Sequence, residues 1–237
     1  MKKNIDNFKM FYLSFLGKAV SNILSQKILN LWKPINNSRI ATIGFCSPYL
    51  RSINKKTQRT FFLVPSSHGL HHFDVNNKNL TVSVNEYILP IDDLSLDRLL
   101  VIHSFEYLTD HNKFLREAWR SLDKNGEILI VVPNSFGLWR PYYKNNLSSL
   151  RTFSFSELNS LLLNNFFMPI NFSNSLFFPP INNQFILDRA NIFEKASKSF
   201  LKFFSGVIIV RARKNYSAAI LKEKKIIKRK VMQKIRS

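Results

Sequence analysis

The chain has little glycine, one cysteine and few acidic residues. Among its 237 residues, 6 are glycine and Cys46 is the one cysteine, which excludes an internal disulfide framework and fits a reducing compartment. Apolar runs stay well short of the roughly 20 residues that a membrane-spanning helix needs. The start of the chain imitates a signal peptide only faintly, because Asp6 and Lys9 precede a very short apolar run and no small-residue cleavage motif follows. These absences predict a cytoplasmic protein.

The scarcity of acidic residues leaves a large positive charge. There are 35 basic residues against 15 acidic ones, a formal charge of +20. Such a field favours nucleic acid, an anionic membrane surface or acidic substrates as partners. Biased codon usage explains it equally well, since Lys, Asn and Ile are all abundant. The tail from residue 222 is the most basic segment, with Ile227, Val231 and Ile235 every four residues, so it fits either a helix on RNA or an anionic membrane, or a solvated tail.

The most regular pattern lies between residues 97 and 132. Asp97 to His103 is an almost unbroken apolar run, which is typical of a strand covered on both faces. A helix follows, then a turn at 123–126 in which Gly126 is free to adopt the positive φ that ends a helix, then a second buried strand at 127–132. Together they predict two parallel strands joined by a right-handed crossover. The helix places four apolar residues on one face: Leu115, Ala118, Trp119 and Leu122.

Further elements surround this unit. Residues 4–32 predict one helix, broken near Gly17, and 155–163 predict another with Ser154 or Ser156 as its N-cap. Further strands are expected at 39–44, 60–64, 80–84 and 206–214, and a further helix at 191–204. Alternating strands and helices indicate the α/β class.

Two segments resemble a known family. ILPIDDLSLDRLLVIHSFEYL and LREAWRSLDKNGEILIVVPN, within residues 85–134, are similar to the fourth strand, following helix and fifth strand of class I S-adenosylmethionine-dependent methyltransferases of the type 11-like group. The resemblance implies a Rossmann-like, mostly parallel seven-stranded sheet with an antiparallel last strand and helices on both faces. It also implies an N-terminal helical cap (1–36), a methyltransferase-like domain (37–216) and a basic C-terminal tail (217–237).

The resemblance implies S-adenosyl-L-methionine as cofactor, held at three strand ends. The loop after the first strand is a degenerate form of the family's glycine-rich loop, because Gly44 alone survives as glycine. The acid that usually binds the ribose after the second strand is replaced by Pro65-Ser66-Ser67. Implied cofactor contacts are Ile43, Gly44, Phe45, Cys46, Ser66, Asn85 and Glu86, although Asn85 equally fits a strand-end cap and the loop a degenerate one that binds nothing.

The remaining polar candidates fall into three groups. His103, at the end of a predicted strand, is the best-placed base for the methyl acceptor, with packing as the alternative. Asn134, Trp139 and Arg140 follow the next strand and are expected to contact substrate, although an aromatic loop anchor fits equally well. The remaining candidates fit structural roles. Asp92, Asp93 and Asp97 suit a turn and a strand-start cap, and His68, His71 and His72 lack the spacing of metal ligands, so no metal is expected.

Two functions from different classes follow. One is transfer of a methyl group from S-adenosylmethionine to an unknown acceptor. The other is a non-catalytic module with the methyltransferase fold, which binds RNA or an anionic surface through its charge. The degenerate loop favours the second. A dinucleotide-dependent oxidoreductase is disfavoured, because the chain lacks Gly-x-Gly-x-x-Gly and an acid after its second strand.

Overall fold

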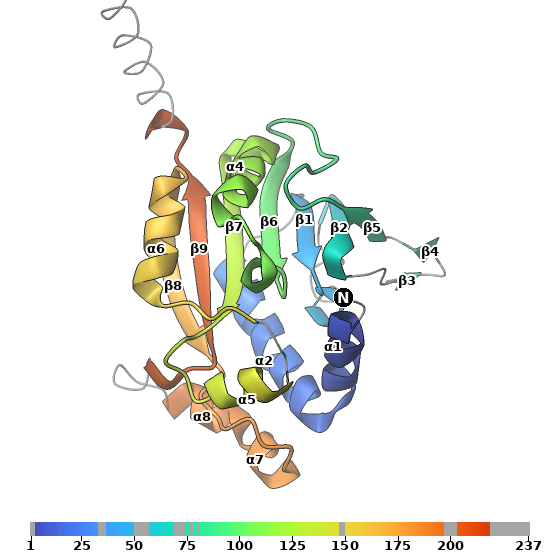
Figure 1. The fold of residues 1–237 in the computed structure, drawn as a ribbon, viewed down its shortest axis with the longest axis vertical. Coiled ribbons are helices and arrows are strands. Elements are labelled where there is room, and N and C mark those ends of the chain that lie inside the picture. The colour runs from blue at the N-terminus through green and yellow to red at the C-terminus, as the bar shows by residue number, and fades with distance from the viewer. Residues whose placement is uncertain are drawn as a thin grey trace, which may run out of the picture.

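A seven-stranded sheet forms the centre of the molecule, with the strand order β5-β2-β1-β6-β7-β9-β8 (Figure 1). The computed structural model describes residues 3–32, 37–49, 57–68, 74–75, 78–79, 81–146, 150–196 and 203–218. The strands are β1 (Arg39–Gly44), β2 (Arg59–Pro65), β5 (Thr81–Val84), β6 (Leu96–Ile102), β7 (Leu122–Pro133), β8 (Phe167–Ser175) and β9 (Val207–Lys214). A separate hairpin joins β3 (Asp74–Val75) to β4 (Lys78–Asn79).

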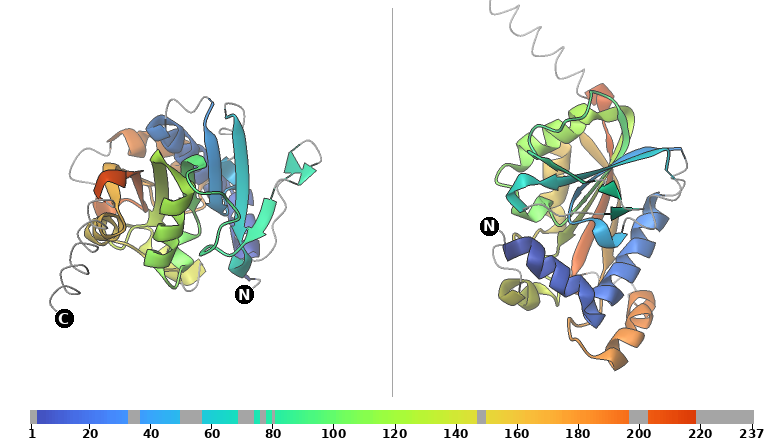
Figure 2. Two further views of the ribbon diagram at one scale, coloured as in Figure 1. Left: turned by 90° about the horizontal axis from the view of Figure 1, so that it is seen from above. Right: turned by 90° about the vertical axis from the view of Figure 1, so that its right-hand side faces the viewer.

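The sheet is mostly parallel. β1 pairs in parallel with β2 and β6, β2 with β5, and β6 with β7, whereas β9 runs antiparallel to β7 and β8. The predicted α/β class, the mostly parallel sheet and the antiparallel last strand are therefore confirmed. Central strands are apolar throughout because helices cover both faces; α2 and α4 lie on opposite sides of the sheet (Figure 2).

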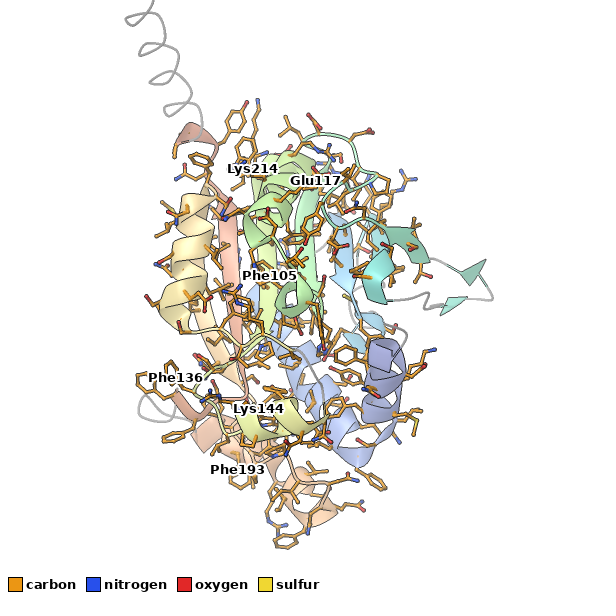
Figure 3. The ribbon with its side chains drawn as sticks, in the orientation of Figure 1. Phe105, Glu117, Phe136, Lys144, Phe193 and Lys214 are labelled. Atoms are coloured by element: carbon orange, nitrogen blue, oxygen red, sulfur yellow. The ribbon has the colours of Figure 1, made fainter. Side chains whose placement is uncertain are left out.

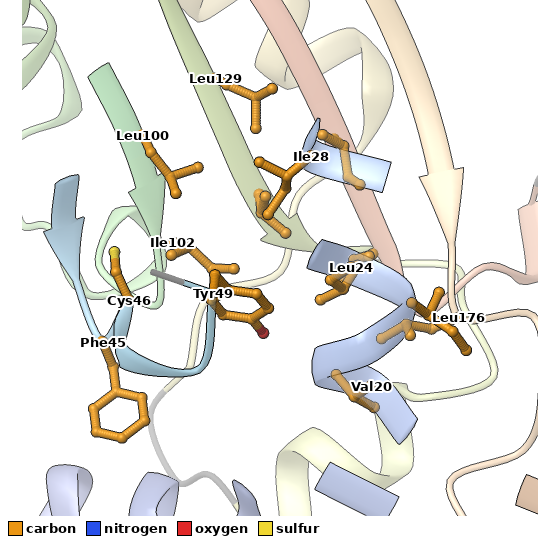
Figure 4. Packing of buried hydrophobic residues seen from close by; sticks show 14 of the residues in the cluster. Val20, Leu24, Ile28, Phe45, Cys46, Tyr49, Leu100, Ile102, Leu129 and Leu176 are labelled. Atoms are coloured by element: carbon orange, nitrogen blue, oxygen red, sulfur yellow. The ribbon is translucent and has the colours of Figure 1, made fainter. Parts of the chain in front are cut away.

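One face packs against α2 (Phe15–Trp32). Val20, Leu24 and Ile28 are spaced one turn apart along this helix and are buried in one cluster with Leu100 and Leu129 of the sheet (Figure 4). This first core cluster also receives residues from α5 (Arg140–Asn146) and α8 (Ala190–Ala196).

The opposite face packs against α4 (His111–Ser121) and α6 (Phe155–Asn164). Phe114 and Leu115 of α4 are fully buried there. Asp110 caps α4 by accepting a hydrogen bond from the Lys113 amide, at 2.9 Å. The Ser154 hydroxyl accepts one from the Glu157 amide and caps α6, which confirms one of the two predicted caps.

The N-terminal segment expected as one helix broken near Gly17 forms two helices. α1 (Lys3–Leu13) and α2 meet at Ser14, three residues before the predicted break. The Ser14 hydroxyl donates to the Phe11 carbonyl and accepts from the Gly17 amide, so it closes a tight corner. A Cβ on Gly17 would lie 1.9 Å from the Phe11 carbonyl oxygen, which explains why this position is a glycine.

Three other expectations needed correction. Gly126 does not have the predicted positive φ, and β7 begins already at Leu122. The edge strand β8 was not expected, because Pro169 and polar residues interrupt its alternation and its register shifts between Pro169 and Asn171. The helix predicted at 191–204 is confirmed in its first part by α8, residues 197–202 lie outside the described chain, and the short helix α7 (Gln184–Asp188) before it was not expected.

Arginine side chains form hydrogen bonds at the amino ends of the parallel strands. Asp97 of β6 accepts hydrogen bonds from the Arg39 amide and guanidinium, at 2.7 and 2.8 Å. Arg98 and Arg211 donate to the carbonyl oxygens of Trp32 and Leu31, at the C-terminus of α2. These cations meet the negative end of the helix, so they join α2 to the sheet.

Within the described residues, no helix is both long and apolar enough to cross a membrane. The basic tail lies outside the described chain from residue 219 onward, so its predicted helix has no structural counterpart here.

Candidate functional site

The carboxyl ends of β1 and β6 meet at Gly44 and Ile102, which are paired in register. Gly44 has a φ of 104°, and a Cβ there would lie 2.1 Å from the Ile102 carbonyl oxygen. A side chain is therefore excluded by the neighbouring strand itself. The close approach that requires glycine in this loop is an approach to β6.

The loop after β1 directs its side chains in two directions. Cys46 is buried, its thiol lies 3.5 Å from the Ile43 carbonyl oxygen, and burial raises the pKa of the thiol to about 12. Phe45 extends the opposite way from the loop (Figure 4) and is 5% exposed. Cys46 is thus a neutral core residue, and Phe45 faces the N-terminal helix.

α1 covers this strand edge with aromatic rings. Phe8 and Tyr12, one turn apart, stack on Phe45 with centroid separations of 5.6 and 5.7 Å. Phe8 also contacts the His103 ring at 4.5 Å. The Tyr12 hydroxyl lies 2.5 Å from both the Tyr49 hydroxyl and His103 Nε2. Burial, with Tyr49 beside it, raises the pKa of Tyr12 well above 10.0, so the hydroxyl is neutral.

His103 occupies a strained position directly after β6. Its φ is 55°, in the left-handed region that non-glycine residues rarely adopt. Its Nδ1 lies 3.5 Å from Oε1 of Glu106, in the short helix η2 (Phe105–Tyr107). Glu106 is 2% exposed, and its Oε2 has no hydrogen-bond partner within the described structure. An unpaired buried carboxylate oxygen is costly, which marks this cluster as a functional candidate.

A small cavity lies beneath α1. It measures about 30 Å³, enough for about two water molecules. Glu106 and His103 contribute its polar side, and the ends of β7 and the aromatic residues of α1 and α5 form the rest. These aromatic residues are Phe8, Phe11, Tyr12, Tyr142 and Tyr143, together with Trp139.

The predicted cofactor residues divide between two places. Ile43, Gly44, Phe45 and Cys46 lie at the strand edge covered by α1, and Ser66, Asn85 and Glu86 follow β2 and β5. None of these seven residues lines the cavity beneath α1. Ser66 is exposed in η1 (Ser66–His68), and Asn85 accepts a hydrogen bond from the Tyr87 amide in a turn after β5.

The predicted substrate residues have different surroundings. Trp139 lines the cavity and is fixed by donating from Nε1 to the Phe178 carbonyl, at 2.8 Å. Asn134 is buried and donates to the carbonyl oxygens of Phe203 and Ser205. Arg140 is exposed at the start of α5. Trp139 is thus the one of the three that borders the cavity.

Sequence reasoning missed Tyr12, Tyr49 and Glu106. They lie close to His103 in space although Tyr12 is 91 residues away in sequence. One signal was available: Glu106 is an acidic residue among apolar neighbours directly after a buried strand. Among the described side chains, no group of histidine, cysteine and acidic residues could hold a metal ion; His71 and His72 lie outside them.

Comparisons with known proteins agree with the fold. Residues 74–130 match a family model described as "Methyltransferase domain". No curated protein matches the chain significantly. Many solved structures share the fold.

Three of these structures illustrate the range of similarity. A Thermotoga maritima S-adenosylmethionine-dependent methyltransferase, described as a possible histamine N-methyltransferase, has a TM-score of 0.63 at 16% identity, covering 90% of this chain and 97% of that one. An Archaeoglobus fulgidus S-adenosylmethionine-dependent methyltransferase has a TM-score of 0.56 at 16% identity, covering 81% and 93%. Geranyl diphosphate C-methyltransferase from Streptomyces coelicolor, in complex with S-adenosyl-L-homocysteine, has a TM-score of 0.53 at 11% identity, covering 81% of this chain and 75% of that one.

The family match and the shared fold confirm the resemblance to class I S-adenosylmethionine-dependent methyltransferases. At these identities the structures establish the fold, and the sequence match covers the region from β3 into β7.

Proposed function

We propose that the protein transfers a methyl group from S-adenosylmethionine to an acceptor at the strand edge beneath α1. The observation that carries the proposal is the cluster of half-buried Tyr12 and His103 with buried Glu106 at the carboxyl end of β6. Open α/β sheets bind their ligands at this edge. The strained His103 and the unpaired oxygen of Glu106 are costly for folding, and such costs concentrate at functional sites.

The chemistry of this cluster fits the cofactor. Its sulfonium carries a positive charge, which aromatic faces and a carboxylate oxygen both attract. The cavity beneath α1 is too small to hold the cofactor while α1 is closed. Ligand pockets typically measure roughly 300–1,000 Å³, and the cavity beneath α1 measures about 30 Å³. Cofactor entry therefore requires α1 to move away from the strand edge.

The attachment of α1 supports such a movement. Within the described structure, its side-chain hydrogen bonds to the sheet side run through one hydroxyl, that of Tyr12. The remaining contacts are apolar and come from rings such as Phe8 and Phe11. The corner at Ser14 supplies a pivot. A short helix held in this way opens at lower free energy than the central strands. We accordingly assign residues 1–36 as a cap on the domain at 37–216.

When bound, the cofactor supplies a methyl group already activated by its sulfonium, so the protein's task is placement, exclusion of water and removal of a proton. His103 is the proposed base. Opening of α1 would free Nε2 from Tyr12, while Glu106 still orients the ring through Nδ1. Trp139 is the proposed wall for the acceptor. Arg140 and Asn134 stay in the proposal as acceptor contacts, although Asn134 lines a separate groove with Phe136 and Phe203.

Cofactor contacts at Ile43, Gly44, Phe45, Cys46, Ser66, Asn85 and Glu86 remain part of the proposal. Their support is position: they follow β1, β2 and β5 at the carboxyl ends of the parallel strands. The Gly44 conformation gives no separate support, because contact with Ile102 already requires it.

Calorimetry with S-adenosyl-L-homocysteine tests this function. The wild type should bind it. Tyr12→Phe should bind it about fivefold more tightly, because losing the hydroxyl weakens closure of α1 by about 1 kcal/mol and so raises the open fraction. Met10→Ser is the matched control, since Met10 is 70% exposed on α1 and its affinity should equal that of the wild type. Absence of binding to all three proteins would contradict the proposed function and favour a non-catalytic module.

A further inference from the structure

Exposed apolar side chains concentrate at one end of the molecule. This end, beneath the carboxyl ends of the parallel strands, comprises the α1–α2 corner, α7, α8 and the segments at 136–138 and 203–204. Figure 3 shows Phe136, Lys144 and Phe193 there, opposite Glu117 and Lys214. Between 41% and 71% of each of the following side chains is exposed: Met10, Leu13, Phe15, Phe136, Leu138, Ile181, Phe185, Ile192, Phe193, Phe203 and Phe204. We call this set the apolar end.

The parts of the apolar end adjoin one another. The Leu16 amide donates to Asn182 Oδ1, which joins the start of α2 to the segment before α7. The Leu138 amide donates to the Phe204 carbonyl, and Phe136 and Phe203 line one groove. Large exposed apolar patches are rare on monomeric soluble proteins that have no partner.

Basic side chains surround this surface. Two acidic residues, Asp6 and Asp188, are exposed on the same helices. Two basic side chains lie over exposed rings: Arg189 Cζ is 3.7 Å from the Phe185 ring centroid, and Lys18 Nζ is 5.8 Å from the Phe15 ring centroid. The exposed basic residues of these helices and of α5, which lies at the same end (Figure 3), are Lys9, Lys18, Arg140, Lys144 and Arg189.

We infer that the apolar end docks onto an anionic membrane surface. Aromatic and aliphatic residues beside Lys and Arg are the combination that inserts at the boundary between headgroups and acyl chains. A second copy of the chain fits less well, because two surfaces with excess positive charge repel each other. RNA also fits less well, because the set includes Met, Leu and Ile, which cannot stack on bases as aromatic rings do.

This surface is distinct from the basic tail. The last described residues before the tail pack at the other end, where Tyr216 stacks on Trp119 with centroids 5.9 Å apart. α1 belongs to both the site and the apolar end: Phe8 and Tyr12 face the sheet, and Met10 and Leu13 face outward. Membrane contact would therefore act on the helix that closes the site.

Sedimentation of the full chain with vesicles tests the inference without using the cofactor. Vesicles of phosphatidylcholine with one fifth phosphatidylglycerol should retain the protein, and vesicles of phosphatidylcholine alone should retain at least tenfold less. The double variant Phe185→Ser/Phe203→Ser should bind the anionic vesicles about tenfold more weakly than the wild type. Both side chains are more than 60% exposed, so the fold should be preserved, as circular dichroism would verify.

The matched control is Ile88→Ser/Met168→Ser, which removes exposed apolar side chains elsewhere. Ile88 is 68% and Met168 56% exposed, and Met168 pairs with Arg213 at the opposite end of the sheet. This control should bind like the wild type. Equal losses in both variants, unchanged binding in the Phe variant, or no vesicle binding by the wild type would overturn the inference. So would a dimer, measured by light scattering, or RNA binding that the Phe variant abolishes.

Discussion

The two ends of the parallel strands are built in different ways. At the amino ends, charges are paired: Arg39 with Asp97 at 2.8 Å, Arg211 with Glu127 at 2.8 Å, and Arg120 with Glu117 and Asp93. At the carboxyl ends, neutral tyrosines and phenylalanines surround Glu106, which has an unpaired oxygen. The charged groups at the amino ends are thus paired, which stabilises the fold, although Nε1 of Trp32 and Nε1 of Trp119 have no hydrogen-bond partner there within the described structure. The carboxyl end instead keeps a buried carboxylate with an unpaired oxygen and a strained backbone at His103, which the packing of the fold does not require. This contrast locates the proposed active site.

The largest effect is expected from Gly44→Ala at the carboxyl end. The positive φ and the approach to the Ile102 carbonyl together should cost about 4 kcal/mol of the free energy of unfolding. Urea unfolding followed by circular dichroism measures the loss. Gly126→Ala is the comparison. That glycine has no positive φ, and its Cβ would lie 2.9 Å from the Leu122 Cβ, a milder approach than the 2.1 Å at Gly44, so the loss should be about 2 kcal/mol. Equal losses would show that the Gly44 conformation is not special.

Glu127→Gln tests the amino end and should destabilise the fold by about 3 kcal/mol, because it leaves Arg211 without a carboxylate partner in a buried place. Burial would raise the pKa of Glu127, but the hydrogen bonds from Arg211 and then Arg213 outweigh it and lower the pKa below 4.5. The contribution of the carboxylate is therefore present above pH 4.5 and is lost as pH falls through the lowered pKa. Urea midpoints of both proteins should converge in acid; a constant difference would contradict this account.

Lys214 should make stability depend on pH in the alkaline range. Burial lowers its pKa from 10.5 to about 8, although its ammonium donates to the Leu122 carbonyl and lies 3.8 Å from the Trp119 ring. The unfolded chain then binds more protons at this site between these two values, so the contribution of Lys214 to stability should rise as pH increases from 8 to 10.5. Buried Cys46, with its pKa raised from 9.0 to about 12, contributes the opposite change above pH 9. The thermal midpoint of the wild type should therefore rise relative to that of Lys214→Met over this range. Identical profiles would refute the lowered pKa.

The smallest effect is expected from Asp97→Asn. Both Arg39 and Asp97 are more than a third exposed, so solvent screens their ion pair. The loss should be about 1 kcal/mol or less in urea unfolding and should shrink in high salt. A loss as large as that of Glu127→Gln would mean that exposure does not separate the two pairs.

The unit from β6 through β7 was predictable because its signals are local. Apolar runs and a helical stripe specify it, and residues within about fifty positions complete it. The edge strand β8 was not predictable, since Pro169 and polar residues interrupt the alternation of apolar and polar residues that indicates a strand. The site was predictable only in part. His103 and Gly44 follow strands and so could be placed, whereas Tyr12 and Tyr49 join them through contacts between distant segments.

The reason for Gly44 also could not be read from the sequence. A glycine after the first strand resembles one that makes room for a cofactor, but the atom that approaches it belongs to Ile102. Which partner requires the glycine depends on the register between β1 and β6, and a single sequence does not contain that register.

Amide hydrogen exchange of α1 with and without S-adenosyl-L-homocysteine tests the central claim most directly. Closed α1 and bound cofactor occupy the same strand edge, so saturating S-adenosyl-L-homocysteine should accelerate exchange in residues 3–13. Exchange in α4, residues 111–121 on the opposite face, should stay unchanged. Unchanged or slower exchange in α1 at saturation would contradict the claim that α1 must leave for the cofactor to bind.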